Sequence, residues 1–328
     1  MTTRPPFPIA WDSTMVKAFR TCPKMFYWEY MLHYKTKASS VHLHAGKAFA
    51  SGLEAMRKAF WHEGLSSEDA LLKGIGVLLT EYGDFECPSD SPKSADRMAG
   101  ALEYYHATYP LGGDGADPVP LSDGTRAIEF SFAIPLHGSL RHPETEEPII
   151  YTGRADQVVS WAGGIYPEDD KTTGQLGAKW ADNWLMRSQF TGYVWAARQL
   201  WEKVQGALVT GIAIRKTGFD HARVPTARAP FMVDRWHSQT IEDIMRAMTM
   251  WETGYWDYNL DESCNNYGKC PMLDPCMSIN PQPWLDTHYE IRRWDPISRS
   301  EEALKLLERP KEDDMLLSGA FEGLGFRI

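Results

Sequence analysis

The chain has 328 residues, of which 43% are hydrophobic, so it can bury a sizeable core as one large domain or one domain with elaborations. No apolar run is long enough to cross a bilayer, and the first ten residues lack the apolar centre of a signal peptide. We therefore expect a cytoplasmic protein with no membrane partner. The net charge of −10 argues against binding duplex DNA by bulk electrostatics, although bound metal ions or a local basic groove can offset it.

The first predicted element is a helix from Thr14 to Tyr34 with Cys22 on or near its buried face. Pro23 follows this cysteine directly and suggests a break or a second helix start. A lone cysteine at such a position is most often a small hydrophobic residue of the core. A further helix is predicted from Gly46 to Glu63.

Residues 64–126 are predicted to form a helical insertion with helices at 67–82 and 95–109. The next segment, Ala127–Pro135, alternates as a strand, with Glu129 on the face opposite Ile128 and the other large apolar residues. Glu129 is therefore either a partner of a metal site or a surface charge.

The segment from Tyr151 to Lys171 predicts a β-hairpin around a turn at Trp161-Ala162-Gly163. A hairpin brings Asp156 and Asp169 together at one edge of a sheet. Because strand side chains alternate, Lys171 shares the face of Asp169, whereas Asp170 points to the opposite face. Carboxylate oxygens are the ligands that Mg²⁺ or Mn²⁺ prefers, and a neighbouring lysine can steady an attacking water or a developing phosphate charge. Alternatively, the acids are solvated turn residues.

The remaining predicted elements are a helix at 179–204, strands at 207–215 and 229–233, and a helix at 237–255. Gln189 and Tyr193 share one face of the first of these helices. A basic loop joins the two strands and either lines a nucleic-acid path or is solvated. Its basic residues are Arg215, Lys216, Arg223 and Arg228.

Five cysteines in a cytoplasmic chain are not expected to form a disulfide framework. Cys264, Cys270 and Cys276 form a trio in a loop-like segment, Cys22 is isolated near the other end, and Cys87 is expected to be a bystander.

The sequence Gly153-Arg154-Ala155-Asp156, the following strand, and the triplet Asp169-Asp170-Lys171 resemble the core of the PD-(D/E)XK nucleases, in particular the RecB-like branch. Gln189 and Tyr193 resemble the Gln-x3-Tyr motif of that family. The resemblance covers about residues 11–63 and 127–281.

This resemblance implies that Asp156, Asp169 and the backbone carbonyl of Asp170 are Mg²⁺ or Mn²⁺ ligands, and that Lys171 is the catalytic lysine. It implies that Gln189 and Tyr193 contact the DNA strand and orient the lysine. An acid on the strand before the motif is frequent in the family, which would make Glu129 an additional metal partner.

The family also carries a helix motif of Gly, His and Glu at spacings of four residues. Gly46 and Glu54 match this motif, but Ala50 stands where the histidine would be. Glu54 either takes a ligand role or is a solvated helix acid, and His42 or His44 could instead reach in from the preceding loop.

The segment around Cys22 and Pro23 resembles the iron-sulfur members of this branch, in which one N-terminal cysteine and three C-terminal cysteines hold a 4Fe-4S cluster. The ligands would be Cys22, Cys264, Cys270 and Cys276. A structural Zn²⁺ is the alternative, although its usual C-x2-C knuckles are absent.

The resemblance implies an α/β fold, restriction-endonuclease-like, with a mixed sheet flanked by helices and with an iron-sulfur cluster joining the N- and C-terminal segments. A single domain would span residues 1–281, with the cysteine segment at 256–281 and an extension of unknown role at 282–328, which includes a predicted helix at 300–308.

The implied function is that of a DNA exonuclease of recombination or repair that acts on DNA with single-stranded ends. A phage is a natural setting for such a nuclease, and a phage-encoded enzyme would work in the bacterial host cytosol. The alternatives are a catalytically weakened DNA-binding or assembly protein on the same fold, and a zinc-stapled structural protein. The sequence identifies no protein partner.

Overall fold

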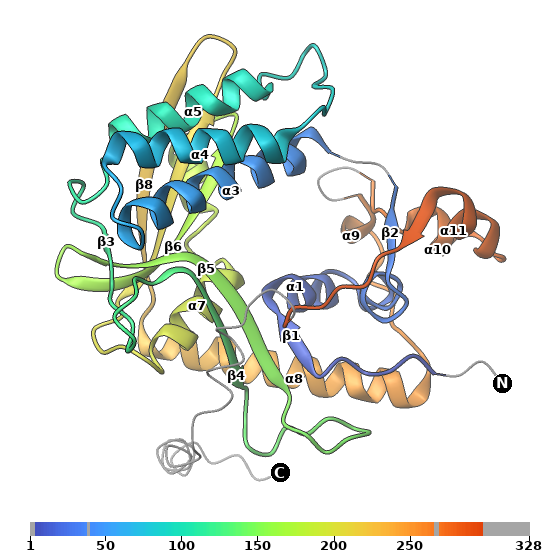
Figure 1. The fold of residues 1–328 in the computed structure, drawn as a ribbon. Coiled ribbons are helices and arrows are strands. Elements are labelled where there is room, and N and C mark those ends of the chain that lie inside the picture. Colours follow the sequence, from blue (N-terminus) through green and yellow to red (C-terminus); the bar gives the residue numbers. More distant parts are fainter. Residues whose placement is uncertain (1–3, 38–39, 266–268, 298–328) are drawn as a thin grey trace.

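A mixed β-sheet flanked by helices forms the centre of the molecule (Figure 1). The structure, a computed structural model, describes residues 4–37, 40–265 and 269–297. Across the sheet, β1, β5, β6, β7 and β8 are neighbours in that order, and β3 and β4 also pair with β5. The strands are β1 (Ala10–Asp12), β3 (Asp117–Pro118), β4 (Ile128–Pro135), β5 (Ile150–Trp161), β6 (Gly164–Thr173), β7 (Gly206–Ile214) and β8 (Phe219–Ala227). The pairs β1–β5 and β6–β7 are parallel and the others are antiparallel, so the fold is α/β with a mixed sheet, as predicted.

The two faces of the sheet are covered by different groups of helices (Figure 1). The principal helices are α1 (Ser13–Thr21), α3 (Val41–Trp61), α4 (Ser67–Tyr82), α5 (Ala95–Thr108), α7 (Ser188–Ala197) and α8 (Pro230–Thr253), with short α2 (Pro23–Phe26), η1 (Tyr27–Met31) and α6 (Ala178–Asp182). On β7, Ile212 and Ile214 pack with α3, α4 and α5, whereas Ala207 and Val209 pack with residues of α1, α7 and α8. Alternate residues of one strand thus serve two cores.

The helical insertion packs tightly against α3. A Cβ atom at Gly52 of α3 would lie 2.9 Å from the carbonyl oxygen of Gly74 in α4. The two glycines therefore permit a close approach that a side chain would prevent. The predicted helices of the insertion, at 67–82 and 95–109, are confirmed as α4 and α5.

Strand β2 and the described residues after α8 form a smaller part of the molecule beside α1 (Figure 1). Strand β2 (Tyr34–Thr36) pairs antiparallel with β9 (Tyr289–Ile291). Between α8 and β9 lie α9 (Glu262–Asn265), α10 (Leu273–Met277) and α11 (Gln282–His288). Trp28, Met272 and Leu285 share a small core with Tyr289, so apolar contacts help to join the segment after α1 to the segment after α8. The predicted helix at 300–308 lies outside the described residues.

Four predicted segments differ from the structure in extent or type. The helix predicted at 14–34 breaks at Cys22, which is extended because Pro23 starts α2. The helix predicted at 179–204 is interrupted between α6 and α7. The strand predicted at 229–233 is the start of α8, with Pro230 at its first position, and the predicted basic loop is mostly β8. None of the helices in the described part of the chain is long and apolar enough to span a membrane.

Candidate functional site

The strands β5 and β6 separate at the residues that the sequence singled out. Their antiparallel ladder ends at the pair Gln157–Glu168, beyond which β5 continues beside β4 and β6 continues beside β7. Asp156 and Asp169 are the first residues past that pair, inside the two strands rather than at their ends. The Asp170 backbone N–H donates to Asp156 Oδ2 at 2.6 Å, so the two segments meet here. We call this place, bounded by Asp156 and Asp169, the strand fork.

The front face of the strand fork collects the other residues of the predicted motif. Lys171 Nζ forms an ion pair with the Asp169 carboxylate. Gln189 Nε2 donates to Asp169 Oδ1 at 3.2 Å and to the Tyr193 hydroxyl oxygen at 2.9 Å. The Tyr193 hydroxyl donates in turn to the Arg154 carbonyl oxygen at 2.6 Å. Gln189 and Tyr193 thus orient an acid and the β5 backbone. The resemblance implied that they orient Lys171, and Asp169, which Gln189 contacts, is the ion-pair partner of Lys171.

Glu129 is a buried third carboxylate at the strand fork. Ile128 pairs with Gln157 and Phe130 pairs with Ala155, which places Glu129 opposite Asp156. Its backbone has a positive φ of 52°, and its carboxylate forms an ion pair with Arg154 Nε at 2.9 Å. The alternative in which Glu129 is a surface charge is therefore wrong.

The helix motif is only partly assembled. Ala50 is exposed on α3, and Glu54 forms an ion pair with Lys58 one turn later, at 2.8 Å. His42 and His44 lie within α3 rather than in a preceding loop. His44 Nε2 contacts the Tyr82 carbonyl oxygen at 2.9 Å, and its ring stacks on another aromatic side chain. His44 therefore does not replace the missing histidine at the strand fork.

Burial and mutual repulsion perturb the carboxylates of the strand fork. Burial raises the pKa of Asp156 well above its ordinary value, and the charges of Asp169 and Glu129 raise it further. Burial also raises the pKa of Asp169, although Lys171 opposes the shift. The pKa of Glu129 is raised to about 7 by burial, against the lowering effect of Arg154. Burial lowers the pKa of Lys171, but the neighbouring carboxylates outweigh this effect and raise it. Such a concentration of carboxylate oxygens fits a hard divalent cation, whose charge would offset the repulsion.

Four of the five cysteines line one pocket of about 730 Å³ between the end of α1 and the segment after α8. They are Cys22, Cys264, Cys270 and Cys276. Burial raises the pKa of Cys270, and burial with the nearby thiols raises that of Cys276 to about 11. Cys87 lies elsewhere, with its sulfur near the Pro88 and Ser91 carbonyl oxygens. The four cysteines therefore share one pocket, and thiolates are the ligands of iron-sulfur clusters and of structural zinc, although among the described residues no three of these side chains stand close enough to form a metal-binding group.

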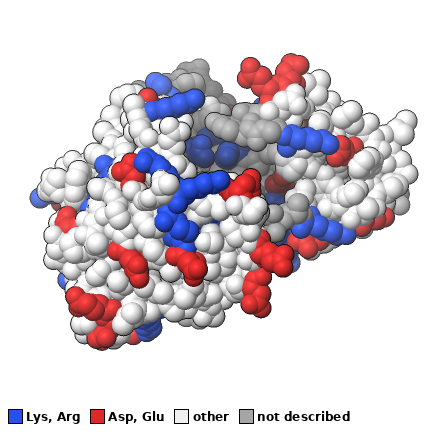
Figure 2. Space-filling model, turned by 90° about the horizontal axis from the view of Figure 1, so that it is seen from above, with Lys and Arg blue, Asp and Glu red and all other residues white. Residues whose placement is uncertain are grey.

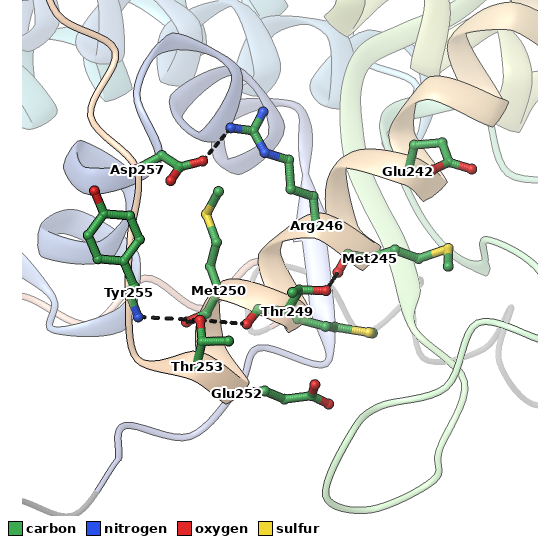
Figure 3. Close-up of a pocket in the computed structure, with 10 residues that line it drawn as sticks. Glu242, Met245, Arg246, Thr249, Met250, Glu252, Thr253, Tyr255 and Asp257 are labelled. Carbon is green, nitrogen blue, oxygen red and sulfur yellow. Dashed lines mark hydrogen bonds and ion pairs between the residues drawn. The ribbon is translucent and has the colours of Figure 1, made fainter.

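A second pocket runs along the C-terminal half of α8 (Figure 3). Arg246 and Asp257 point toward each other there and form an ion pair at 2.7 Å. Both residues, with Tyr255, also line the cysteine pocket, so the two pockets adjoin. None of the residues predicted to act in catalysis or ligand binding lines the pocket along α8.

Within residues 4–37, 40–265 and 269–297, no three His, Cys, Asp or Glu side chains form a ready metal-binding group. At the strand fork, each carboxylate instead turns to a protein partner. Asp169 contacts Lys171, Glu129 contacts Arg154, and Asp156 accepts from the Asp170 N–H. A divalent cation would have to compete with these partners.

Two of the four basic residues predicted to flank a nucleic-acid path serve the fold instead. Arg223 forms an ion pair with Asp114 at 2.8 Å, and Arg228 is buried, with its Nε donating to Thr191 Oγ1 at 2.9 Å. The other two, Arg215 and Lys216, are exposed, and Arg215 forms an ion pair with Asp220.

The sequence analysis missed two exposed basic residues, Arg187 before α7, whose charge acts on Asp169, and Lys17 of α1, which lies near Arg187. Arg20, one turn after Lys17, donates to Ser188 Oγ at 2.9 Å, which brings the two helices together. Partial burial and the like charge of Arg187 lower the pKa of Lys17, and Arg187 also acts on Asp169. Neither has a carboxylate within ion-pair distance among the described residues. No motif marks them, because they belong to elements far apart in the chain.

Also missed were Arg57 of α3 and Tyr105 of α5, which bind the Asp170 side chain. The sequence did carry one signal for Arg57. It lies next to Met56 and four residues after Leu53, so a charged residue stands on the apolar, buried face of α3.

Comparisons with known proteins add little to this geometry. No protein-family model matches the chain, and no curated protein matches it. Among solved structures, the chain is similar to that of the crystal structure of SSO0001, over 62% of this chain and 74% of that chain, at 9% identity and a TM-score of 0.26. At that TM-score the match indicates neither a fold family nor a function.

Proposed function

We propose that this protein is a DNA nuclease that hydrolyses phosphodiester bonds with the help of Mg²⁺ or Mn²⁺. The observation that carries the proposal is the strand fork, where Asp156, Asp169 and Glu129 meet beside Lys171. Residues from β4, β5, β6 and α7 converge there, although nothing in their packing requires four ionisable groups at one place. The convergence supports the PD-(D/E)XK resemblance at the level of the residues that would act.

The roles follow from the contacts. Asp156, Asp169 and the backbone carbonyl of Asp170 would hold Mg²⁺ or Mn²⁺, which when bound supplies a water of lowered pKa and neutralises phosphate charge. Lys171, kept charged by its carboxylate neighbours, is placed to orient a nucleophilic water and to donate to a phosphate oxygen. Gln189 fixes the rotamer of Asp169 through its hydrogen bond. Glu129 adds negative charge behind Asp156 and favours binding of a cation.

A polyanionic substrate is supported by the charge around the site. Lys17 and Arg187 are like charges held near each other with no carboxylate partner among the described residues, and a phosphate between them would relieve their repulsion. Figure 2 shows Lys and Arg side chains interspersed with Asp and Glu on the face seen from above. A local basic groove at the site would be needed to offset the net charge of −10. DNA with single-stranded ends is the proposed substrate, by resemblance to exonucleases of recombination and repair.

The cysteine pocket supports a second element of the proposal, a 4Fe-4S cluster held by Cys22, Cys264, Cys270 and Cys276. Structural Zn²⁺ is the alternative for the same four thiols. Either group would join the break after α1 to the segment after α8. The visible absorption of anaerobically purified protein, together with iron and zinc analysis, separates the two.

The test of the nuclease proposal is digestion of end-labelled single-stranded and double-stranded DNA with Mg²⁺ or Mn²⁺. Lys171→Ala and Asp156→Ala are each expected to lower the rate by about 10²-fold or more while the protein stays folded. Lys73→Ala is the matched control, because Lys73 is a lysine of α4 paired only with Glu63. Equal rates in the wild type and both site variants would overturn the proposal.

One observation favours a second candidate, a DNA-binding or assembly protein with a weakened site. Ala50 places no ligand at the strand fork, and Glu54 is engaged by Lys58. DNA binding by the wild type without cleavage in either metal would select this candidate.

A further inference from the structure

Asp170 lies between Asp169 and Lys171 of the proposed site, but its side chain points to the opposite face of the sheet, where residues of α3 and α5 bind it. Asp169 and Lys171 face one side of β6, and Asp170 faces the other. Arg57 Nη1 donates to Asp170 Oδ2 at 2.7 Å, and the Tyr105 hydroxyl donates to Asp170 Oδ1 at 2.9 Å. Arg57 Nη2 also donates to the Tyr105 hydroxyl oxygen at 2.7 Å, which closes a triangle. The side chains of Arg57 and Asp170 are only 3% and 5% exposed.

Strand β6 has a ladder partner on only one side at Asp170, so side-chain contacts are needed to fix its position there. Asp170 pairs with Thr210 of β7, but the ladder to β5 has already ended at the pair Gln157–Glu168. On the β5 side, the Asp170 N–H donates only to the carboxylate of Asp156. A strand with a ladder on one side can shift within the opening beside it, unless side chains fix it. The contacts from α3 and α5 supply that restraint.

We propose that Arg57 and Tyr105 are positioning residues of the strand fork. By holding the Asp170 side chain, they fix the Asp170 backbone against Asp156 and thereby the spacing of the two acids that would bind the metal. Tyr105 belongs to the helical insertion, so this segment, which carries no recognised motif, has a part in the site. The inference rests on the metal site of the proposed function, and it can be tested by metal binding as well as by cleavage.

The chain offers a matched control in Arg223. Its Nε lies 3.5 Å from Glu168, two residues before Asp170 and on the same face of β6. Glu168, however, has ladder partners on both sides, in Gln157 and Leu208, and accepts a hydrogen bond from Gln157 Nε2 at 2.6 Å. Loss of Arg223 should therefore weaken the fold and leave the geometry of the strand fork intact.

The experiment uses the full chain and measures Mn²⁺ binding by calorimetry, beside the Mn²⁺ dependence of DNA cleavage. Arg57→Met is expected to weaken Mn²⁺ binding about tenfold and to lower kcat, because outer residues orient metal ligands. Its KM for DNA should stay within about twofold of the wild type, since Arg57 is behind the sheet. Arg57→Lys should recover part of the loss, and Tyr105→Phe, the milder change, should show a smaller loss in the same direction.

A double variant separates positioning from general destabilisation. Arg57→Met combined with Asp170→Asn should bind Mn²⁺ no more weakly than the worse single variant, because both changes remove one restraint. Arg223→Met should lower the thermal midpoint and leave Mn²⁺ affinity within about twofold of the wild type. If Arg57→Lys and Tyr105→Phe fold and bind Mn²⁺ as the wild type does, or if Arg223→Met weakens binding equally, the inference is overturned.

Failure of the proposed function gives a different result. A wild type that binds Mn²⁺ without cleaving DNA overturns the nuclease proposal, while a Mn²⁺ affinity that depends on Arg57 still supports the positioning role. A wild type that neither binds Mn²⁺ nor cleaves DNA overturns both.

Discussion

The strand fork and the cysteine pocket are both proposed to hold metal, and they differ in what holds their side chains. At the strand fork, Asp156 and Asp169 lie on strands whose neighbours β4 and β7 fix the backbone, and each acid already has a protein partner. In the cysteine pocket, Cys264 and Cys276 lie on helices of four and five residues. Helices so short have little stability of their own.

This difference indicates at which of the two sites a metal would stabilise the fold. The strand fork is organised by the sheet, so its cation would serve chemistry. The cysteine pocket is built from short helices and the turns between them, so its metal group would also stabilise the segment between α8 and β9. Three predictions would break or sharpen this comparison.

The largest expected effect is that of Cys22→Ser. Loss of one thiolate should release the metal group and expose the segment between α8 and β9 to protease, because the binding energy of a structural metal site, on the order of 10 kcal/mol, is also folding energy. Limited proteolysis with metal analysis measures this. If the pocket holds an iron-sulfur cluster, treatment of the wild type with EDTA, which removes Mg²⁺, should leave the proteolysis pattern unchanged, whereas a Zn²⁺ site would be sensitive to EDTA. Cys87→Ser should leave the proteolysis pattern unchanged in either case. Protease resistance of Cys22→Ser equal to that of the wild type would show that protein contacts alone hold the segment.

A smaller effect is expected from Glu129→Gln. The folded protein raises the pKa of Glu129 to about 7 from its ordinary 4.5, so the folded state binds this proton more tightly than the unfolded state. The resulting stability is present below about pH 4.5 and is lost as the pH rises through about 7, on the order of 3 kcal/mol in total. In urea titrations with EDTA, Glu129→Gln should therefore exceed the wild type in stability at pH 8 and match it near pH 4.5.

Mn²⁺ at pH 8 should stabilise the wild type more than Glu129→Gln, because only the wild type carries a buried negative charge at Glu129 that the cation would offset. Glu63→Gln, a change at an exposed acid paired with Lys73, is the control and should follow the wild type at each pH. Parallel stability curves for wild type and Glu129→Gln would contradict the assignment of Glu129 to the repelled group.

The smallest effect is expected from Lys17→Gln and Arg187→Gln. Each should lower the slope of log affinity for DNA against log salt by about 1, as expected for one lost phosphate contact. Lys73→Gln, on the helical insertion, should leave the slope unchanged. If the salt dependence of DNA affinity is the same in both variants and the wild type, DNA does not contact Lys17 of α1 or Arg187 before α7.

The parts of the fold that were predicted correctly depend on local pattern. Strand alternation put Asp169 and Lys171 on one face and Asp170 on the other, and helix periodicity found α4 and α5. The strand predicted at 229–233 failed because a short apolar run was taken as β, although Pro230 starts a long helix there.

The site was predicted only as far as neighbouring residues define it. Arg57 and its partner Asp170 are 113 positions apart, so no sequence window joins them. Glu129 was placed on its strand but its burial was not foreseen, because the strand is buried on both faces and alternation then says little about exposure. Lys17 and Arg187 meet only through the packing of α1 on α7, which local pattern does not contain.

The pairing of β2 with β9 has a consequence for biosynthesis. Strand β2 and Cys22 leave the ribosome before most of the central sheet, but the partner strand and the other three cysteines follow only after β8 and α8 have been made. During translation, the sheet and its helices can form before Cys264, Cys270 and Cys276 have been synthesised. Insertion of a metal group would thus be a late maturation step, and a chain that stopped short of β9 would carry a formed sheet beside an unfinished pocket.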